Sequence, residues 1–462
     1  MDIKRKAYSK LIEWKNTQNH KPLIVKGLRQ VGKSYIVNKF ANENYNNVII
    51  YDFRHRKELL SIFDGDLDVD TIIRKSRLFF TDKNFDIENT VLIFEEIGDC
   101  PSARTALKSF ALDGRYDIIA TGSLLGVINY RKKNKIKIPT GYEEYLTMTS
   151  LDFEEFLWAN GISEDQIRLL KDYTKQRKEI DEATSYVFKK LLKDYIVIGG
   201  LPEVVARFIE SNKNYLEARN LLERLLIDYR SDFGRFIDDD GNEIIDYYLQ
   251  NKLNMIFDSI PKQLAKEQDV RKFKYSDIKK GGRESEFSEA FEWLDKAGLI
   301  LKCYNTTSLE RPLSLNVDES YFKVFLSDTG LLMAMYPLIT QIDFLNDRLE
   351  SRKGALYENL AAILISKADF PLYYYANGSK HLEIDFLIEG SDGLILYEEK
   401  STNGKMASSR AVMEGKTPYK AQCCYKIIEN NFGYGSFFTS IPQYCAPFLL
   451  EEIKNDILSS FN

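Results

Sequence analysis

The chain of 462 residues contains only three histidines and five cysteines. The histidines, His20, His55 and His381, are far apart in the sequence, which argues against a catalytic or zinc site built on a histidine cluster. The cysteines are odd in number, and no pair of them has the spacing of metal ligands. Reduced thiols are therefore expected, as in a cytoplasmic protein.

Long apolar segments are also missing. No stretch reaches the roughly 18 apolar residues that a membrane-spanning helix needs, and the basic residues 1–6 are not followed by the apolar segment of a secretory signal. These absences predict a cytoplasmic location and no membrane partner. The formal net charge of −5 gives no general signature of nucleic-acid binding, so a nucleic-acid partner would have to contact a local basic patch.

The sequence does contain enough apolar material for folded domains, since 44% of the residues are hydrophobic and 13% are aromatic. The length exceeds what a single core supports, so about two to four domains are expected. Strand-like and helix-like patterns alternate over residues 1–160. This alternation predicts an α/β domain whose parallel sheet is covered by helices.

Residues 23–34 carry the clearest motif. An apolar run ends in Gly27, four residues follow, and then come Gly32, Lys33 and Ser34, which is the spacing of a phosphate-binding P-loop. Backbone N–H groups in such a loop point at the phosphates, Lys33 is expected to reach the β- and γ-phosphates, and Ser34 is expected to bind Mg²⁺. The predicted nucleotide-binding residues are Gly27, Arg29, Gln30, Val31, Gly32, Lys33, Ser34 and Tyr35.

Three further strands are expected at 47–53, 90–96 and 117–123, each an apolar run that ends in polar residues. The carboxyl ends of parallel strands meet at one edge of a sheet, beside the P-loop. There Glu95 is predicted to assist the metal, and Glu96 to orient the attacking water as a catalytic residue together with Lys33. Thr121 and Ser123 are predicted to contact the γ-phosphate.

Arginine and lysine residues near this module allow more than one interpretation. Arg115 and Arg131 are candidates for an arginine that stabilises phosphate charge, and Arg29 lies inside the loop itself. Residues 130–137 form the most basic run. This run is either a solvated loop or a contact for nucleic-acid phosphates.

Four stretches, 27–34, 94–97, 119–126 and 151–157, resemble a family of bacterial and archaeal AAA-type ATPases that carry a C-terminal domain of unknown function. The resemblance covers nearly the whole chain. It implies a P-loop NTPase fold with ATP and Mg²⁺ as cofactors, related to signal-transducing ATPases. In such proteins the residue at position 95 is usually Asp, whereas Glu95 stands here.

The middle of the chain shows helical periodicity over 163–257, interrupted at Gly199-Gly200-Leu201-Pro202, where one helix is expected to stop and another to start. Residues 259–335 follow the order helix, helix, helix and strand pair, which is typical of a winged helix. The third helix, 284–289, is acidic. Contact with a protein partner therefore stands beside DNA binding as an interpretation.

The C-terminal part has an acidic residue, Asp385, in one strand and Glu398 and Lys400 in its expected hairpin partner, with Glu358 on the preceding helix. This order resembles the PD-(D/E)xK nuclease superfamily and its restriction-endonuclease-like α/β fold. Asp385 and Glu398 would hold Mg²⁺, and Lys400 would act on water beside a phosphodiester. A hairpin with charged surface residues is the alternative.

Together these patterns predict four units: a P-loop ATPase core (1–160), a helical region (161–258), a winged-helix-like unit (259–340) and a nuclease-like domain (350–462). The leading hypothesis is Mg²⁺-dependent ATP binding and hydrolysis that changes the relation between the units. An ATP-controlled nuclease and a non-hydrolysing ATP-bound switch are the alternatives. Nucleic acid, a protein partner and a second copy of the chain remain open as partners.

Overall fold

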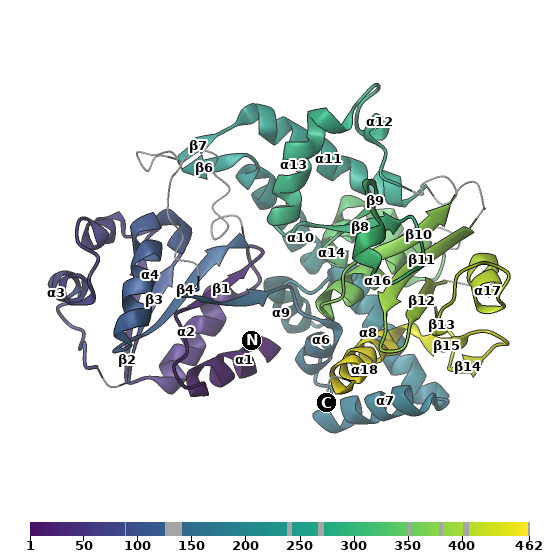
Figure 1. The fold of residues 1–462 in the computed structure, drawn as a ribbon. Helices are drawn as coiled ribbons and strands as arrows, with labels where there is room; N and C mark the ends of the chain where they lie inside the picture. Colours follow the sequence, from purple (N-terminus) through teal and green to yellow (C-terminus); the bar gives the residue numbers. More distant parts are fainter. Residues whose placement is uncertain are drawn as a thin grey trace.

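The computed structural model describes residues 1–87, 89–124, 141–237, 243–266, 272–349, 353–377, 382–400 and 406–460. Figure 1 shows a smaller sheet built from the N-terminal residues and a larger sheet built from the C-terminal half, with helices between them. None of the described helices combines the length and the apolar character needed to cross a membrane.

The N-terminal sheet is fully parallel and has the strand order β2-β3-β4-β1-β5. Its strands are β1 (Leu23–Gly27), β2 (Asn47–Asp52), β3 (Thr90–Glu95), β4 (Asp117–Ser123) and β5 (Glu144–Met148). The predicted α/β class and the predicted strands β1 to β4 are confirmed. The short edge strand β5 was not predicted, because three of its five residues are polar or aromatic and partly exposed.

Residues on each strand alternate between two helical layers, as the period of a strand requires. Leu23 and Val25 of β1 belong to the core on one face, with α1 and α2. Ile24 belongs to the core on the other face, with α3 and α4. The helices of the two layers (Figure 1) are α1 (Lys6–Asn16), α2 (Lys33–Asn44), α3 (Val69–Phe79) and α4 (Pro101–Asp113). Two short helices, η1 (Lys57–Phe63) and η2 (Ile97–Asp99), precede α3 and α4.

A helical region follows the sheet. Gly199, which has a positive φ of 72°, closes α8, and Pro202 opens α9, which confirms the expected stop and restart. A short hairpin, β6 (Arg235–Ile237) with β7 (Glu243–Ile245), precedes the next long helix. The helices are α6 (Phe153–Ala159), α7 (Glu164–Gln176), α8 (Glu182–Ile198), α9 (Pro202–Glu210), α10 (Tyr215–Asp232), α11 (Tyr247–Leu264), α12 (Tyr275–Ile278) and α13 (Glu284–Lys296).

The C-terminal sheet is mixed and has the order β14-β15-β13-β12-β11-β10-β8-β9. Its strands are β8 (Ile300–Thr306), β9 (Val317–Leu326), β10 (Tyr373–Asn377), β11 (Leu382–Glu389), β12 (Leu394–Glu399), β13 (Cys423–Ile428), β14 (Gly433–Tyr434) and β15 (Thr439–Pro442). The two strands expected to form a wing are β8 and β9. They do not stand apart from the C-terminal strands, because Tyr304 and Asn305 of β8 pair with β10.

Helices enclose this sheet, and one continuous core runs from α1 to α18. Shared apolar packing therefore joins the N-terminal and C-terminal halves. The enclosing elements are η3 (Leu313–Asn316), α14 (Thr329–Met335), α15 (Leu338–Leu345), α16 (Gly354–Lys367), α17 (Ala407–Met413), η5 (Gln443–Cys445) and α18 (Ala446–Ser459).

Candidate functional site

The P-loop connects the end of β1 to the start of α2. A Cβ atom on Gly27 would lie 2.1 Å from the carbonyl oxygen of Met148 on β5, so the close approach of β5 requires glycine there. Gly32 has a φ of 85°, and Gln30 has a φ of 65°. Two left-handed residues within three positions turn the chain tightly before α2.

Lys33 is the central side chain of the loop and is only 7% exposed. Its Nζ donates hydrogen bonds to the carbonyl oxygens of Leu28 (2.9 Å) and Gly27 (3.2 Å). Burial lowers the pKa of Lys33 to about 8; the negative charge of Glu96 opposes this effect, and the positive charges of Arg29 and Arg54 add to it. Among the described residues no carboxylate pairs with this buried ammonium group, which can therefore bind an anion.

The N-terminus of α2 has no side-chain cap, because its N-cap residue is Gly32. The first N–H groups of a helix have no intrahelical acceptor, so an uncapped end favours phosphate. Ser34 is exposed at this end. Tyr35 points to the surface, where its hydroxyl donates to Asp2 (3.0 Å). Val31 is buried, and its carbonyl oxygen accepts a hydrogen bond from Arg5 (2.9 Å).

The two predicted carboxylates lie at the end of β3. Glu95 accepts a hydrogen bond from Asn38 of α2 (Nδ2 to Oε1, 3.1 Å). Glu96 follows in a left-handed conformation (φ 52°), and its backbone N–H donates to Thr121 Oγ1 (3.4 Å). Thr121 is buried and thus holds the backbone of Glu96, while Ser123 pairs in register with Gly27 at the start of the loop.

The donor set fits magnesium. The Ser34 hydroxyl and the Glu95 carboxylate are hard oxygen ligands, and Mg²⁺ is bound through one or two such groups together with substrate phosphates. Within the described residues, no three His, Cys, Asp or Glu side chains are grouped as a ready-made metal site.

Sequence reasoning missed Arg54, which follows β2 at the same edge of the sheet. Its Nη2 lies 3.7 Å from Glu96 Oε2, and its Nε lies 3.2 Å from Asp99 Oδ2. A signal existed, because Arg54 comes directly after a strand that ends beside the P-loop. Arg115, by contrast, precedes β4 and pairs with Asp70 and Asp113, so it lies at the opposite edge. Arg131 and the basic run 130–137 lie outside the described residues.

A second charged cluster lies in the C-terminal sheet. Lys400 Nζ lies 2.5 Å from Asp385 Oδ2 and 2.9 Å from Glu398 Oε2. Glu358 of α16 is paired with Lys323 of β9 (2.7 Å). The four predicted residues Glu358, Asp385, Glu398 and Lys400 therefore converge, but two lysines neutralise their carboxylates.

A cavity of about 220 Å³ is lined by Glu358, Asp385, Lys400 and also Glu399. Glu398 is instead buried at 2% exposure, where Ser409 donates to it. Burial, followed by the charge of Asp385, raises the pKa of Glu398 to about 8. Burial alone would raise the pKa of Asp385, but the charges of Lys400 and Lys323, together with hydrogen bonds from Lys400 and Glu398, keep this pKa below its usual value.

The described arrangement of this cluster does not fit Mg²⁺, because Lys400 lies between Asp385 and Glu398 and takes the place that a cation would need. Sequence reasoning missed Lys323, which lies within the apolar pattern of β9, and Glu399, which neighbours Glu398. No local signal could have found Lys323, since its role depends on the packing of β9 against α16.

Comparison with known families gives three matches. Residues 19–157 match the model of an AAA domain. Residues 189–342 match a domain of unknown function (DUF8612), and residues 353–444 match another (DUF4143). The predicted AAA-type P-loop core is thereby confirmed, and such a fold implies nucleotide binding.

No curated protein matches the chain. Among solved structures, the chain is similar to a Walker-type ATPase of Pyrococcus abyssi (15% identity, 72% of this chain and 96% of that chain, TM-score 0.39). It is also similar to the ORC1 protein of Aeropyrum pernix in complex with DNA (12%, 75% and 93%, 0.30). A third is the RuvB Holliday junction branch migration motor of Thermotoga maritima (13%, 64% and 89%, 0.26).

The AAA domain contacts the helical region directly at its P-loop. Arg29 forms an ion pair with Asp232 at the end of α10, and the hydroxyl of Tyr229 on the same helix donates to the carbonyl oxygen of Arg29 (2.9 Å). A Cβ atom on Gly32 would lie 3.8 Å from Pro202, at the start of α9. The loop that would hold phosphate therefore touches two helices outside the AAA domain.

Proposed function

We propose that the chain binds ATP with Mg²⁺ at the P-loop, hydrolyses it, and transmits the state of the nucleotide to the helical region and the C-terminal sheet. The observation that carries this proposal is the buried Lys33 at an uncapped helix N-terminus, whose ammonium group has no carboxylate partner among the described residues. Triphosphate oxygens supply the missing negative charge.

The roles of the side chains follow from their positions. Lys33 leaves the carbonyl groups of Gly27 and Leu28 and donates to the β- and γ-phosphates. Ser34 and Glu95 hold the metal, which when bound neutralises charge on the phosphates. Glu96 orients water for attack, and Arg54 beside it holds this carboxylate at the same edge of the sheet.

Transmission would run through the contacts of the P-loop with α10. A phosphate that reorders the loop shifts the backbone of Arg29, which accepts a hydrogen bond from Tyr229. The ion pair of Arg29 with Asp232 moves with it. Because α10 packs against α14, which follows β9 at the edge of the C-terminal sheet, a shift of α10 reaches that sheet.

Proton uptake tests the assignment of Lys33. With a pKa of about 8, Lys33 is mostly neutral at pH 9, whereas bound phosphate favours its charged form and raises this pKa. ATP binding should therefore take up a proton above pH 8, and the affinity should fall by up to about tenfold per pH unit there. At pH 7 Lys33 is already charged, so it contributes no uptake.

The measurement is calorimetric titration of the full chain with ATP and Mg²⁺ at pH 8.5, in two buffers of different ionisation enthalpy. Lys39→Ala, on the exposed side of the same helix, is the control and should keep the uptake. Binding without proton uptake would contradict the placement of Lys33 at the phosphates. Tight binding of ATP without release of phosphate would instead support the alternative of a non-hydrolysing switch, which binds a protein, a nucleic acid or a second copy of the chain.

We propose, as a second candidate, an ATP-controlled nuclease in the C-terminal sheet. Its support is the convergence of Glu358, Asp385 and Lys400 on one cavity. In that cavity the ammonium group of Lys400 would bind a phosphodiester oxygen or orient water. Asp385 would hold Lys400 in place through their ion pair.

Cleavage of labelled DNA or RNA, incubated with the chain, Mg²⁺ and ATP, tests this candidate. Asp385→Asn keeps the shape of the side chain but removes its charge, so cleavage should fall by about 100-fold or more. Asp392→Asn, an exposed acid in the turn between β11 and β12, is the matched control and should cleave like the original chain. If neither nucleic acid is cut, or Asp385→Asn cuts as well as the control, the cluster is structural.

A further inference from the structure

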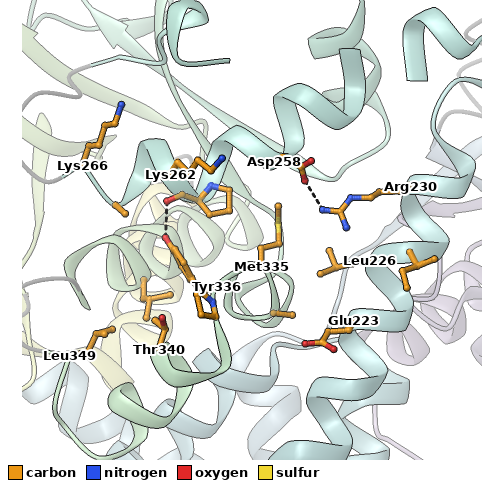
Figure 2. A pocket seen from close by; sticks show the side chains of 16 residues that line it. Glu223, Leu226, Arg230, Asp258, Lys262, Lys266, Met335, Tyr336, Thr340 and Leu349 are labelled. Atoms are coloured by element: carbon orange, nitrogen blue, oxygen red, sulfur yellow. Dashed lines mark hydrogen bonds and ion pairs between the residues drawn. The ribbon is translucent and has the colours of Figure 1, made fainter. Parts of the chain in front are cut away.

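A larger cavity lies outside both sites described above. It has a volume of about 840 Å³ and lies between α10, α11, the segment that joins α14 to α15, and α16 (Figure 2). This volume is within the range of small-molecule sites, roughly 300–1,000 Å³. No P-loop residue and none of the carboxylates Glu358, Asp385 and Glu398 lines it.

Hydrogen bonds fix the walls of this cavity in place. Buried Arg219 of α10 donates to the carbonyl oxygens of Tyr336 (2.8 Å) and Ala334 (3.3 Å). The hydroxyl of Tyr336 donates to the carbonyl oxygen of Pro261 on α11 (3.0 Å), as drawn in Figure 2. The three walls are therefore tied to one another before any ligand binds, which lowers the cost of binding.

The lining has an apolar part, which includes Leu226, Met335 and Leu349. Two arginines neutralise the acids of the cavity wall: Arg219 pairs with Glu223 (2.8 Å), and Arg230 pairs with Asp258 (2.6 Å). The remaining lining charges are positive.

Those positive charges are two lysines at the C-terminal end of α11. Lys262 has no ion-pair partner within the described part of the chain. Lys266, four residues further on, is paired with Asp277 (2.7 Å), which does not line the cavity, and its own side chain is 54% exposed. Since the acids of the wall are already neutralised, Lys262 leaves the cavity one positive charge that an anion can neutralise.

We propose that this cavity is a second ligand site and that it binds an amphipathic anion, a small molecule with an apolar body and one negatively charged head. The apolar body packs against Leu226, Met335 and Leu349. The head binds Lys262 and Lys266. The volume of about 840 Å³ and the fixed walls favour a small molecule over an extended peptide.

Two probes with the same apolar chain and opposite charge test this site by calorimetry on the full chain, below their micelle concentrations. Dodecanoate should bind saturably, with one molecule per chain. Dodecyltrimethylammonium should bind at least about tenfold more weakly, because it brings a positive charge to the lysines. Equal affinity for the two probes, or binding of dodecanoate that does not saturate, overturns the proposal.

Variants locate the binding within the chain. Lys262→Glu should weaken dodecanoate binding by about tenfold or more and leave ATP binding unchanged, and Leu226→Glu should weaken both probes. Lys190→Glu, on an exposed position of α8, is the matched control and should bind like the original chain. Unchanged affinity in Lys262→Glu, with a melting temperature equal to that of the control, places the probe elsewhere and overturns the proposal.

Discussion

Replacing Lys33 with alanine is expected to weaken ATP binding by at least about 100-fold, because charge-assisted hydrogen bonds to the phosphates are lost. The structure supports a large effect, since Lys33 is buried in the loop and donates to the backbone carbonyl groups of Gly27 and Leu28. Calorimetric titration with ATP and Mg²⁺ at pH 7 measures the loss directly.

Lys39→Ala is the matched control for this substitution. Lys39 lies on the same helix, but its partner is Asp2 at the protein surface, so its removal should change ATP affinity by less than about threefold. Thermal unfolding should show both variants folded, because neither substitution removes an apolar contact of the core. If Lys33→Ala binds ATP as tightly as Lys39→Ala, the P-loop is not the nucleotide site.

Glu96→Gln is expected to leave ATP binding nearly intact and to slow hydrolysis by about 10²–10⁴-fold, the range for loss of a positioned general base. Thr121 holds the backbone of Glu96, and Arg54 lies beside its carboxylate. The amide keeps the size of the side chain but cannot accept a proton from water. Phosphate release under saturating ATP measures the effect, and Glu58→Gln in η1, an exposed acid, is the control.

The same variant gives two further readouts. The charge of Glu96 raises the pKa of Lys33, so ATP affinity in Glu96→Gln should begin to fall at a lower pH than in the original chain. ATP held without turnover should also slow amide hydrogen exchange in α10, if α10 follows the P-loop. A hydrolysis rate within tenfold of the control would contradict the proposed role of Glu96. Unchanged amide hydrogen exchange in α10 would contradict transmission of the nucleotide state through this helix.

Much of the N-terminal half was predictable because its signals are local. A strand, a glycine loop and a helix in sequence define the P-loop, and strand ends in a parallel sheet must share one edge, which placed Glu95, Glu96 and Ser123 near the loop. The structure shows that α2 begins at Lys33 itself, which puts the Lys33 side chain at the same point as the first N–H groups of the helix.

The C-terminal half was predictable only in part. The hairpin of β11 and β12 was expected from the order of its charged residues, and the four charged residues lie close together. The ion pairs among these residues did not follow from the sequence. A period of two places Glu398 and Lys400 on one face of a strand, but it does not show that Lys323 of β9 lies beside Glu358. The strands expected as a separate wing extend the larger sheet, since the edge of β8 is completed by β10.

The sequence alone determined the parallel sheet, the phosphate loop and the polar residues at the ends of its strands, since each depends on spacing along a few neighbouring residues. Only the tertiary structure decided which charges neutralise one another and what the loop touches. Arg54 beside Glu96, α10 against Arg29, the lysines within the C-terminal cluster and the cavity next to Lys262 all join residues far apart in the chain. Such contacts arise from the packing of whole elements, for which no local spacing rule exists.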